Sequence, residues 1–530
     1  MGETVLTGRG ASSGLAIGSA VLARRGESGC TTGEAKADAL HLREAIDRAR
    51  AEIENLAADL DDDAGEILAF QIELLDDGSF MDPAFVDIGQ GATCKAALDR
   101  AFAAQVALFE SDDDPYFQAR AADVRDVHER LVRLLSGQSE PGSELPAHAV
   151  WVAEDLTPSL FLTLERKGLA AVVLARGSAA SHVAMLARAR EVPMVVGVGG
   201  AGRVIGDGAE LVVDADAGEV VVDADQARLE ACRRRLIEQR DAAALARAWR
   251  GRTPVTSSGR RIAVEINVED PLLLDRLDPA DCDGIGLVRT EFLYDDAGAV
   301  DEDRQFAIYR RLLGWAKGRP VTVRTLDAGG DKPIAGLTGE PEPNPFLGLR
   351  GIRLSLARPE VFAVQLRALA RAAAHGPLRV MVPMVSVPEE IDEVRALLGR
   401  MVTDLLAEGR AAAMPPLGMM VEVPSAALCA RDFAVDFYSI GSNDLAQYVL
   451  AAARDQPDVA HLYRPMHPSV LRLIREVVEA GRDKGVLVSL CGDLAGEPAA
   501  VSALLELGLE RLSVTPAALG RVKHAIADLP

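Results

Sequence analysis

The sequence has no long apolar run and no sign of a secretory leader. No stretch of about 18 uncharged apolar residues occurs in the chain, so no membrane-spanning helix is predicted. The opening segment, MGETVLTGRGASSG, lacks the basic start and the apolar core of a signal peptide. We therefore expect a cytoplasmic protein.

Cysteine is scarce, and its positions do not form a pattern. No CxxC pair occurs, and the spacings do not resemble a disulfide framework, so the thiols suit a reducing compartment. The six cysteines are Cys30, Cys94, Cys232, Cys282, Cys429 and Cys491.

Basic residues are in the minority. The chain has 57 Lys and Arg against 80 Asp and Glu, a formal net charge of −23. This balance argues against a nucleic-acid or anionic-membrane partner and favours a basic protein partner. Taken alone, the charge is explained as simply by solubility.

A chain of 530 residues, 49% of them hydrophobic, exceeds one ordinary core and should form several domains. Residues 32–137 carry apolar residues at helical spacing and predict an inserted bundle of helical hairpins. Residues 1–31 and 138–225 contain short β-branched runs and Gly-rich turns, with one helical stretch at residues 182–189, and predict an α/β domain. Residues 226–255 begin with a charged segment free of Gly and Pro, which predicts a linker helix.

The remaining residues, 256–530, alternate strand and helix patterns. Such alternation over this length predicts a (β/α)8 barrel at the carboxyl end of a multidomain α/β protein. The eight candidate strands are RIAVEINV, GIGLV, VTVRTL, LRVMVPM, LGMMVEV, FYSIG, VLVSLC and RLSVT.

Charged side chains follow several of these candidate strands. Arg289 follows the second, Arg324 lies in the third, and the NPFLGLR segment adds Arg350. Barrel enzymes gather such groups at one mouth, and planar guanidinium donors match phosphate and carboxylate, so we expect a polyanionic substrate. Glu422 after the fifth strand and Asp444 after the sixth are the oxygen ligands that Mg²⁺ prefers.

A thiol joins these charges, because Cys491 ends the seventh candidate strand. At an ordinary pKa of about 8.5 it is mostly protonated at neutral pH and can donate a proton. A lone cysteine is usually a small buried hydrophobe, and isolated charged residues usually form surface ion pairs. Their co-occurrence at the ends of five strands favours a functional site.

In the amino-terminal half, the segment GSAASHVAMLAR places His182 at the start of a predicted helix. Unpaired N–H groups at a helix amino terminus favour an arriving phosphate. A single histidine in this position is more often a cap or a core residue, so the segment alone does not decide its role.

Together these motifs resemble Enzyme I, the phosphoenolpyruvate–protein phosphotransferase family of the bacterial sugar phosphotransferase system, over nearly the whole chain. The matching segments are the Gly8 to Gly18 run, DLTPS, SHVAMLAR, GIGLVRTEFL, VRTLDAGGDK, MMVEVPSA, SNDLAQY and LCGDLAG. The roles that the resemblance implies are the phosphorylated histidine, His182; the phosphoenolpyruvate contacts, Arg289, Arg324, Asn443, Asp444 and Arg454; the Mg²⁺ ligands, Glu422 and Asp444; and the proton donor, Cys491.

The same resemblance implies partners and a motion. Nε2 of His182 would attack the phosphorus of phosphoenolpyruvate after the α/β domain swivels toward the barrel. The helical insertion would dock the small phosphocarrier protein HPr, and the barrel would form a homodimer. Composition and spacing by themselves indicate none of these.

The chain departs from the family pattern at several positions. Ser178 and Ala180 fall in a segment where the family usually has an arginine or similar residue and a threonine. Gln71 replaces a histidine common in the helical insertion, and the chain ends at Pro530 soon after the last strand. The sequence therefore leaves open the strength of carrier binding and of dimerisation.

Three other functions have to be weighed. Pyruvate phosphate dikinase and phosphoenolpyruvate synthase share the histidine and barrel but need an additional ATP-binding domain. A nitrogen-system paralogue would normally carry a sensory domain in front. A regulatory phosphocarrier that senses phosphoenolpyruvate without turnover is disfavoured by the intact Cys491.

Overall fold

The computed structural model describes residues 3–23, 35–58, 60, 63–111, 115–138, 142, 145–179, 181–295, 298–299, 301–330, 332, 334, 336–339, 342–454, 456 and 458–530. Cys30 and Ala180 lie outside this part of the chain. The protein divides into two compact units, Met1–Gln239 and Arg240–Pro530.

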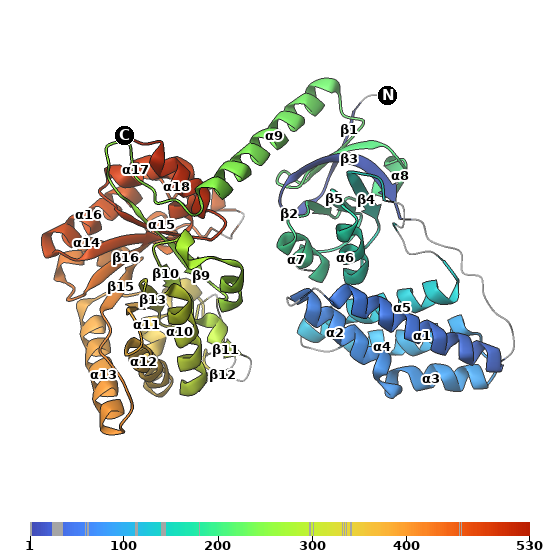
Figure 1. The fold of residues 1–530 in the computed structure, drawn as a ribbon, viewed down its shortest axis with the longest axis horizontal. Helices are drawn as coiled ribbons and strands as arrows, with labels where there is room; N and C mark the ends of the chain where they lie inside the picture. The colour runs from blue at the N-terminus through green and yellow to red at the C-terminus, as the bar shows by residue number, and fades with distance from the viewer. Residues whose placement is uncertain are drawn as a thin grey trace. The chain divides into compact units, whose positions relative to one another are not determined.

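A mixed sheet of eight strands forms the centre of the first unit (Figure 1). Its spatial order is β1-β8-β7-β3-β4-β5-β6-β2, and β3 to β6 pair in parallel while the other neighbours are antiparallel. The opening segment and the segment after residue 148 thus build one sheet. The strands are β1 (Thr4–Thr7), β2 (Arg9–Ser12), β3 (Leu15–Leu22), β4 (Ala149–Ala153), β5 (Ala171–Leu174), β6 (Met194–Val196), β7 (Glu210–Asp214) and β8 (Glu219–Val222).

The expectation of a single helix between these strands was wrong. The structure has α7 (His182–Ala189), as expected, but also α6 (Pro158–Arg166) and the short α8 (Ala201–Val204). Pro158 suits the first turn of α6 because that turn leaves its N–H groups unpaired anyway. Phe161 and Leu164 then bury the inner face of the helix.

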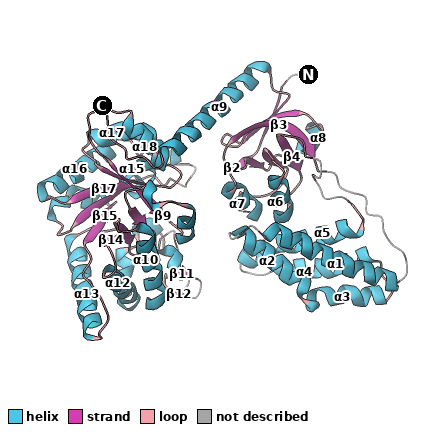
Figure 2. Cartoon of the chain, in the orientation of Figure 1, coloured by secondary structure: helices cyan, strands magenta, loops and turns pink. Residues whose placement is uncertain are grey.

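Five helices lie in sequence between β3 and β4, as the periodicity predicted (Figure 2). They are α1 (Ala35–Ala57), α2 (Asp63–Asp76), α3 (Gly78–Gly89), α4 (Cys94–Glu110) and α5 (Pro115–Leu135). Ile53, Phe102 and Leu131 are buried among them. The same apolar cluster continues into Phe161 of α6 and Leu186 of α7, which lie on the sheet face toward these helices (Figure 1). The insertion and the sheet therefore share one core.

The second unit contains a closed barrel of eight strands, each parallel to its neighbours, which confirms the predicted (β/α)8 fold. The strands are β9 (Ala263–Val268), β10 (Ile285–Val288), β13 (Val321–Arg324), β14 (Leu378–Val382), β15 (Leu417–Val421), β16 (Phe437–Gly441), β17 (Leu487–Cys491) and β18 (Arg511–Val514). A small hairpin, β11 (Tyr294–Asp295) with β12 (Gly298–Ala299), follows β10. The helices are α10 (Glu302–Ala316), α11 (Ile352–Ala357), α12 (Pro359–Ala373), α13 (Pro388–Ala407), α14 (Pro424–Leu428), α15 (Ser442–Leu450), α16 (Pro468–Lys484), α17 (Val501–Glu506) and α18 (Leu519–Ala527).

The charged segment after the sheet forms one helix, α9 (Gln226–Trp249), and the division between the two units falls inside it. Leu229 and Cys232 near its start pack against Leu15 of the sheet.

Within the residues that the structure covers, no helix is both long and apolar enough to cross a membrane. The five cysteines in this part of the chain, Cys94, Cys232, Cys282, Cys429 and Cys491, are free thiols.

Candidate active site

The side chains predicted for the barrel lie at one mouth, where the parallel strands end. Each lies at the last residue of a strand or shortly after it: Arg289 after β10, Arg324 in β13, Glu422 after β15, Asn443 and Asp444 after β16, and Cys491 in β17. Arg454 follows the end of α15. This is the face on which barrel enzymes carry their chemistry.

A fully buried carboxylate, Asp327, holds the cations of the mouth together. Its oxygens accept hydrogen bonds from Nε and Nη2 of Arg350, both at 3.1 Å, and from Nζ of Lys332 at 2.9 Å. Nη1 of Arg324 lies 3.2 Å from the same carboxylate. Burial opposes ionisation of Asp327, but these three positive charges outweigh it and hold its pKa well below the ordinary range. No pattern in the sequence indicated this role for Asp327.

Arg324 is fixed between two carboxylates. Its Nη2 donates to Oε1 of Glu291 at 2.7 Å, and that oxygen also accepts the N–H of Asp327 at 3.2 Å. Although burial disfavours the charged form, both carboxylates raise the pKa of Arg324. Nε of Arg324, Oε2 of Glu291 and Oγ1 of Thr325 are buried without a hydrogen-bond partner among the described residues. Such orphaned polar atoms favour a bound polar ligand.

Two carboxylates of the mouth suit a metal ion. Oε1 of Glu422 accepts the N–H of Met384 at 2.7 Å, and Oδ2 of Asp444 accepts from Nη2 of Arg350 at 2.7 Å. Burial, with the neighbouring negative charges of Asp444 and Asp327, raises the pKa of Glu422 to about 8. A buried carboxylate in this environment is stabilised by an added cation. Within the part of the chain that the structure covers, no group of three or more His, Cys, Asp or Glu side chains is placed to hold a metal ion.

Three predicted residues lie nearer the rim. Arg289 is 40% exposed and pairs with Glu269 at 2.7 Å. Arg454 is exposed beside the hydroxyl of Tyr463. Asn443 exchanges two hydrogen bonds with Asp493, one from Nδ2 to the carboxylate at 3.2 Å and one from the Asp493 N–H to its Oδ1 at 3.0 Å. The rim thus adds side chains that are less constrained than the buried network.

The thiol of Cys491 is buried at the top of the barrel interior. Oγ of Ser439 donates to its sulfur at 3.3 Å, and the packing neighbours include Met420 and Phe437. Burial raises the pKa of Cys491 to about 11, so the thiol keeps its proton at neutral pH. The next residue, Gly492, has φ of 113°, and a Cβ there would lie 2.4 Å from Oγ of Ser442. Glycine therefore allows the end of β17 to approach the start of α15 closely.

His182 begins α7, as predicted, and its surroundings hold it in place. Oγ of Ser181 accepts the N–H of Ala184 at 3.2 Å and caps the helix. Nδ1 of His182 lies 3.7 Å from Oδ1 of Asp123, a fully buried residue of α5. No local sequence signal links these two residues, because the contact joins the helical insertion to the α/β domain. Asp123 is thus a site residue that sequence reasoning missed.

Gln71, which replaces a histidine common in the family, has a structural role. It is fully buried, and its Nε2 donates to Oδ2 of Asp126 at 2.9 Å. The same carboxylate accepts the N–H of Ser159 at 2.8 Å and its hydroxyl at 2.6 Å. Gln71 therefore supports the aspartate that fixes the start of α6 against the insertion.

Oδ1 of Asp123 and Nδ1 of His182 are too far apart to hydrogen-bond, so they interact through charge. For the phosphorylated histidine that the motifs imply, Asp123→Asn is expected to slow phosphorylation of His182 by about tenfold or more, because it removes the negative charge that favours a proton on Nδ1 and leaves Nε2 as the nucleophile. The rate is measured by rapid quench with labelled phosphoenolpyruvate, over a range of pH. Asp47→Asn on the exposed face of α1 is the matched control. Equal rates for Asp123→Asn and the wild type would contradict a positioning role.

A parallel barrel whose mouth combines arginines, two carboxylates suited to a metal and a protonated thiol defines an enzyme that acts on a small polyanion. Three protein-family models match the chain: the PEP-utilising enzyme PEP-binding domain over residues 243–530, the N-terminal domain over residues 7–120 and the mobile domain over residues 145–218.

Proteins named phosphoenolpyruvate-protein phosphotransferase are similar along nearly the full length. The protein of Priestia megaterium is 36% identical over 539 aligned positions, covering 99% of this chain and 94% of that protein. The protein of Geobacillus stearothermophilus is 37% identical, covering 97% and 91%. A solution structure of Enzyme I aligns with 27% identity and a TM-score of 0.39, covering 44% of this chain and 99% of that one.

The chain belongs to the phosphoenolpyruvate–protein phosphotransferase family. It is therefore a transferase of the PEP-utilising enzymes, and the resemblance inferred from its motifs is confirmed. Phosphoenolpyruvate is the substrate that the family implies, and these enzymes use a metal ion.

Proposed function

We propose that the protein transfers the phosphoryl group of phosphoenolpyruvate to Nε2 of His182 and then to a histidine of the small phosphocarrier protein HPr, releasing pyruvate. This is the first step of a sugar phosphotransferase system and takes place in the cytoplasm. The observation that carries the proposal is the convergence of Arg324, Glu422, Asp444 and Cys491 at one barrel mouth.

The charges of the mouth match those of phosphoenolpyruvate, which carries a carboxylate and a phosphate. Arg324 is already rigid, so it loses little freedom when it binds an anionic oxygen. Arg289, Asn443 and Arg454 complete the contacts from the rim. Asp444 lies beside both the substrate position and the metal position.

Glu422 and Asp444 would hold Mg²⁺. When bound, Mg²⁺ neutralises negative charge on the substrate oxygens. The protein's own contribution is the fixed pair of carboxylates, since Glu422 is held by the Met384 N–H and Asp444 by Arg350.

The proposed transfer consists of two coupled steps, phosphoryl transfer and proton transfer. Nε2 of His182 forms a bond to phosphorus as the bond from phosphorus to the enol oxygen breaks. The proton of the Cys491 thiol passes to the methylene carbon, so the enolpyruvate becomes pyruvate. Solvent then returns a proton to the thiolate. The positive groups of the mouth stabilise the negative charge that develops on the enol oxygen before the carbon is protonated.

The reaction requires that His182 of the first unit reach the barrel mouth of the second, so we propose a swivelling α/β domain of residues 1–31 and 138–225 joined through a linker at residues 226–255. The helical subdomain, residues 32–137, would dock HPr. The barrel, residues 256–530, would bind phosphoenolpyruvate and form a homodimer.

The test combines the purified protein with phosphoenolpyruvate, Mg²⁺ and HPr, and measures pyruvate and phosphorylated HPr separately. The proposal predicts equal molar amounts of the two products. Arg203→Ala, on the α/β domain away from the described site, serves as the matched control for His182→Ala. Pyruvate formation without phosphorylated HPr would reject the proposed acceptor, and no pyruvate would reject turnover.

Replacement of Glu422 by glutamine is expected to raise the Mg²⁺ concentration for half-maximal rate by at least about tenfold, because a neutral amide binds a hard cation more weakly. Removal of the metal with EDTA should stop turnover, and added Mg²⁺ should restore it. Glu479→Gln on α16 provides a control carboxylate away from the mouth. An unchanged Mg²⁺ requirement in Glu422→Gln would contradict the metal assignment.

A further inference from the structure

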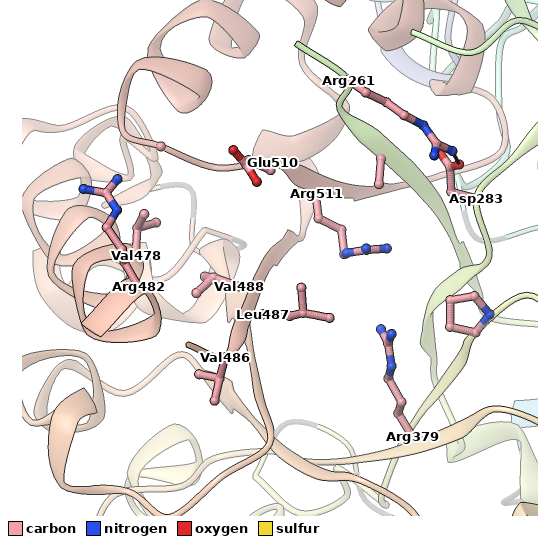
Figure 3. A pocket seen from close by; sticks show the side chains of 13 residues that line it. Arg261, Asp283, Arg379, Val478, Arg482, Val486, Leu487, Val488, Glu510 and Arg511 are labelled. Atoms are coloured by element: carbon pink, nitrogen blue, oxygen red, sulfur yellow. Dashed lines mark hydrogen bonds and ion pairs between the residues drawn. The ribbon is translucent and has the colours of Figure 1, made fainter. Parts of the chain in front are cut away.

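The opposite end of the barrel contains a cavity of about 780 Å³ (Figure 3). Its walls come from the segments where strands begin, including Ala263 of β9, Arg379 of β14 and Arg511 of β18. Leu487 starts β17 and lines this cavity, whereas Cys491 ends the same strand at the mouth. At about 3.3 Å per residue, the two sites are roughly 13 Å apart along the strand.

Arginine dominates the polar lining of the cavity. The four arginines are Arg261, Arg379, Arg482 and Arg511. Figure 3 shows the side chains of Arg379 and Arg511 extending into the cavity toward one another. The acidic side chains of the lining are Asp283 and Glu510. This excess of cations is unusual for a chain with a net charge of −23.

Two of the four arginines are already paired with carboxylates. Arg261 lies 2.5 Å from Asp283, and Arg511 lies 2.5 Å from Glu265. The second acidic residue of the lining is also engaged, because Glu510 lies 3.4 Å from Arg260, which is not part of the lining.

Arg379 and Arg482 form no ion pair with a carboxylate in the part of the chain that the structure describes. Arg379 is half-buried, and its guanidinium carbon lies 5.9 Å from the centre of the Phe437 ring. Arg482 is exposed at the end of α16, with Nη2 near Gly508 at the cavity wall. Burial lowers the pKa of Arg379; the nearby carboxylate of Glu265 opposes this shift and the charge of Arg511 adds to it, so an anion bound beside Arg379 would further stabilise its charged form.

The cavity also has an apolar side. Val478, Val486, Leu487 and Val488 form part of its wall. A volume of this size is typical of small-molecule sites, which combine apolar walls with a few polar anchors. In (β/α)8 barrel enzymes the active site lies at the opposite, carboxyl-terminal face, so this cavity lies outside the catalytic end of the barrel.

We propose that this cavity binds a small organic polyanion, bearing phosphate or carboxylate groups, at a site separate from the active-site mouth. Arg379 and Arg511, whose side chains extend toward one another, are its principal anchors, and Arg482 and the paired Arg261 add positive potential from the edges of the cavity. The valine and leucine side chains contact the carbon portion of the ligand. The site is independent of the proposed phosphotransfer, since it uses none of the residues of the mouth.

Isothermal titration calorimetry tests this site with two probes, inorganic pyrophosphate for phosphate groups and citrate for carboxylates on a carbon frame. We expect at least one probe to bind the full-length protein. Arg379→Met should weaken that binding by about tenfold or more, because it removes a charge-assisted contact, and Arg482→Ala should weaken it by a smaller factor, because it removes only a more distant charge. Arg472→Ala, exposed on the same helix, should bind like the wild type.

Arg289→Ala distinguishes anion binding at the cavity from anion binding at the mouth. This replacement should weaken binding at the mouth and leave binding at the cavity unchanged. Because Arg482 is exposed, its replacement should preserve the fold, which circular dichroism checks. Binding that is lost in Arg289→Ala but retained in Arg482→Ala and Arg379→Met would overturn the proposal. So would the absence of binding of both probes at millimolar concentration.

Discussion

Replacement of Cys491 by alanine is expected to slow pyruvate formation by about 10²–10⁴-fold, the range associated with loss of a general acid. The thiol is the proposed acid, because burial raises the pKa of Cys491 to about 11 and its proton is therefore present throughout the neutral range. Alanine leaves no titratable proton at this position. Pyruvate is measured by coupling its release to NADH oxidation by lactate dehydrogenase.

Cys429 offers a matched control, because it is the exposed free cysteine of the same barrel. Cys429→Ala should retain the wild-type rate. Thermal unfolding of Cys491→Ala should remain close to that of the wild type, since only one sulfur atom is removed from the core. A Cys491→Ala enzyme that is folded and turns over at the wild-type rate would show that another group supplies the proton.

Replacement of Asp327 by alanine is expected to lower the free energy of unfolding of the barrel by about 3–5 kcal/mol, the cost of breaking a buried charge network by removing one partner. Asp327 is fully buried and contacts Arg324, Arg350 and Lys332. Without it, two buried guanidinium groups lose their principal counter-charge. Chemical denaturation with urea measures the difference.

The contribution of Asp327 to the free energy of unfolding should decrease at low pH. Its pKa is lowered in the folded state, so its stabilising contribution is fully present above the unfolded value of about 3.9 and is lost as the pH falls through the folded-state pKa. The difference between Asp327→Ala and the wild type should therefore be constant near neutral pH and shrink in strong acid.

A surface ion pair provides the control for this experiment. Asp483 lies 2.8 Å from Arg431, and both side chains are about half exposed, at 57% and 47%. Asp483→Ala should change the unfolding free energy by less than about 1 kcal/mol, because solvent screens exposed pairs. Equal losses for Asp327→Ala and Asp483→Ala would contradict the structural role of the buried network.

The barrel could be predicted from the sequence because each of its strands has a local residue pattern. Each candidate strand is a short β-branched or apolar run, and all eight form the closed barrel. The same local patterns explain why Arg289, Arg324, Glu422 and Cys491 could be placed at one mouth, since each follows or ends a strand and parallel strands end at one face. Helix α6 was missed even though its Thr157-Pro158 start was visible in the sequence.

Contacts between distant segments could not be read from the sequence. Asp123 reaches His182 only because the helical insertion packs on the α/β domain, and Arg350 reaches Asp444 only because the barrel closes. The anion site proposed at the strand starts depends on which arginines there form no ion pair with a carboxylate. Ion pairing is set by the positions of side chains in three dimensions, so spacing along the chain does not reveal it.

The proposed function depends on the phosphorylation of His182 by phosphoenolpyruvate. The most direct test incubates the protein with Mg²⁺ and ³²P-labelled phosphoenolpyruvate, without ATP, beside His182→Ala, and then examines the acid and base stability of the label. An acid-labile, base-stable label is expected on the wild type, and no label is expected on His182→Ala. Equal labelling of both proteins, or labelling of neither, would contradict it.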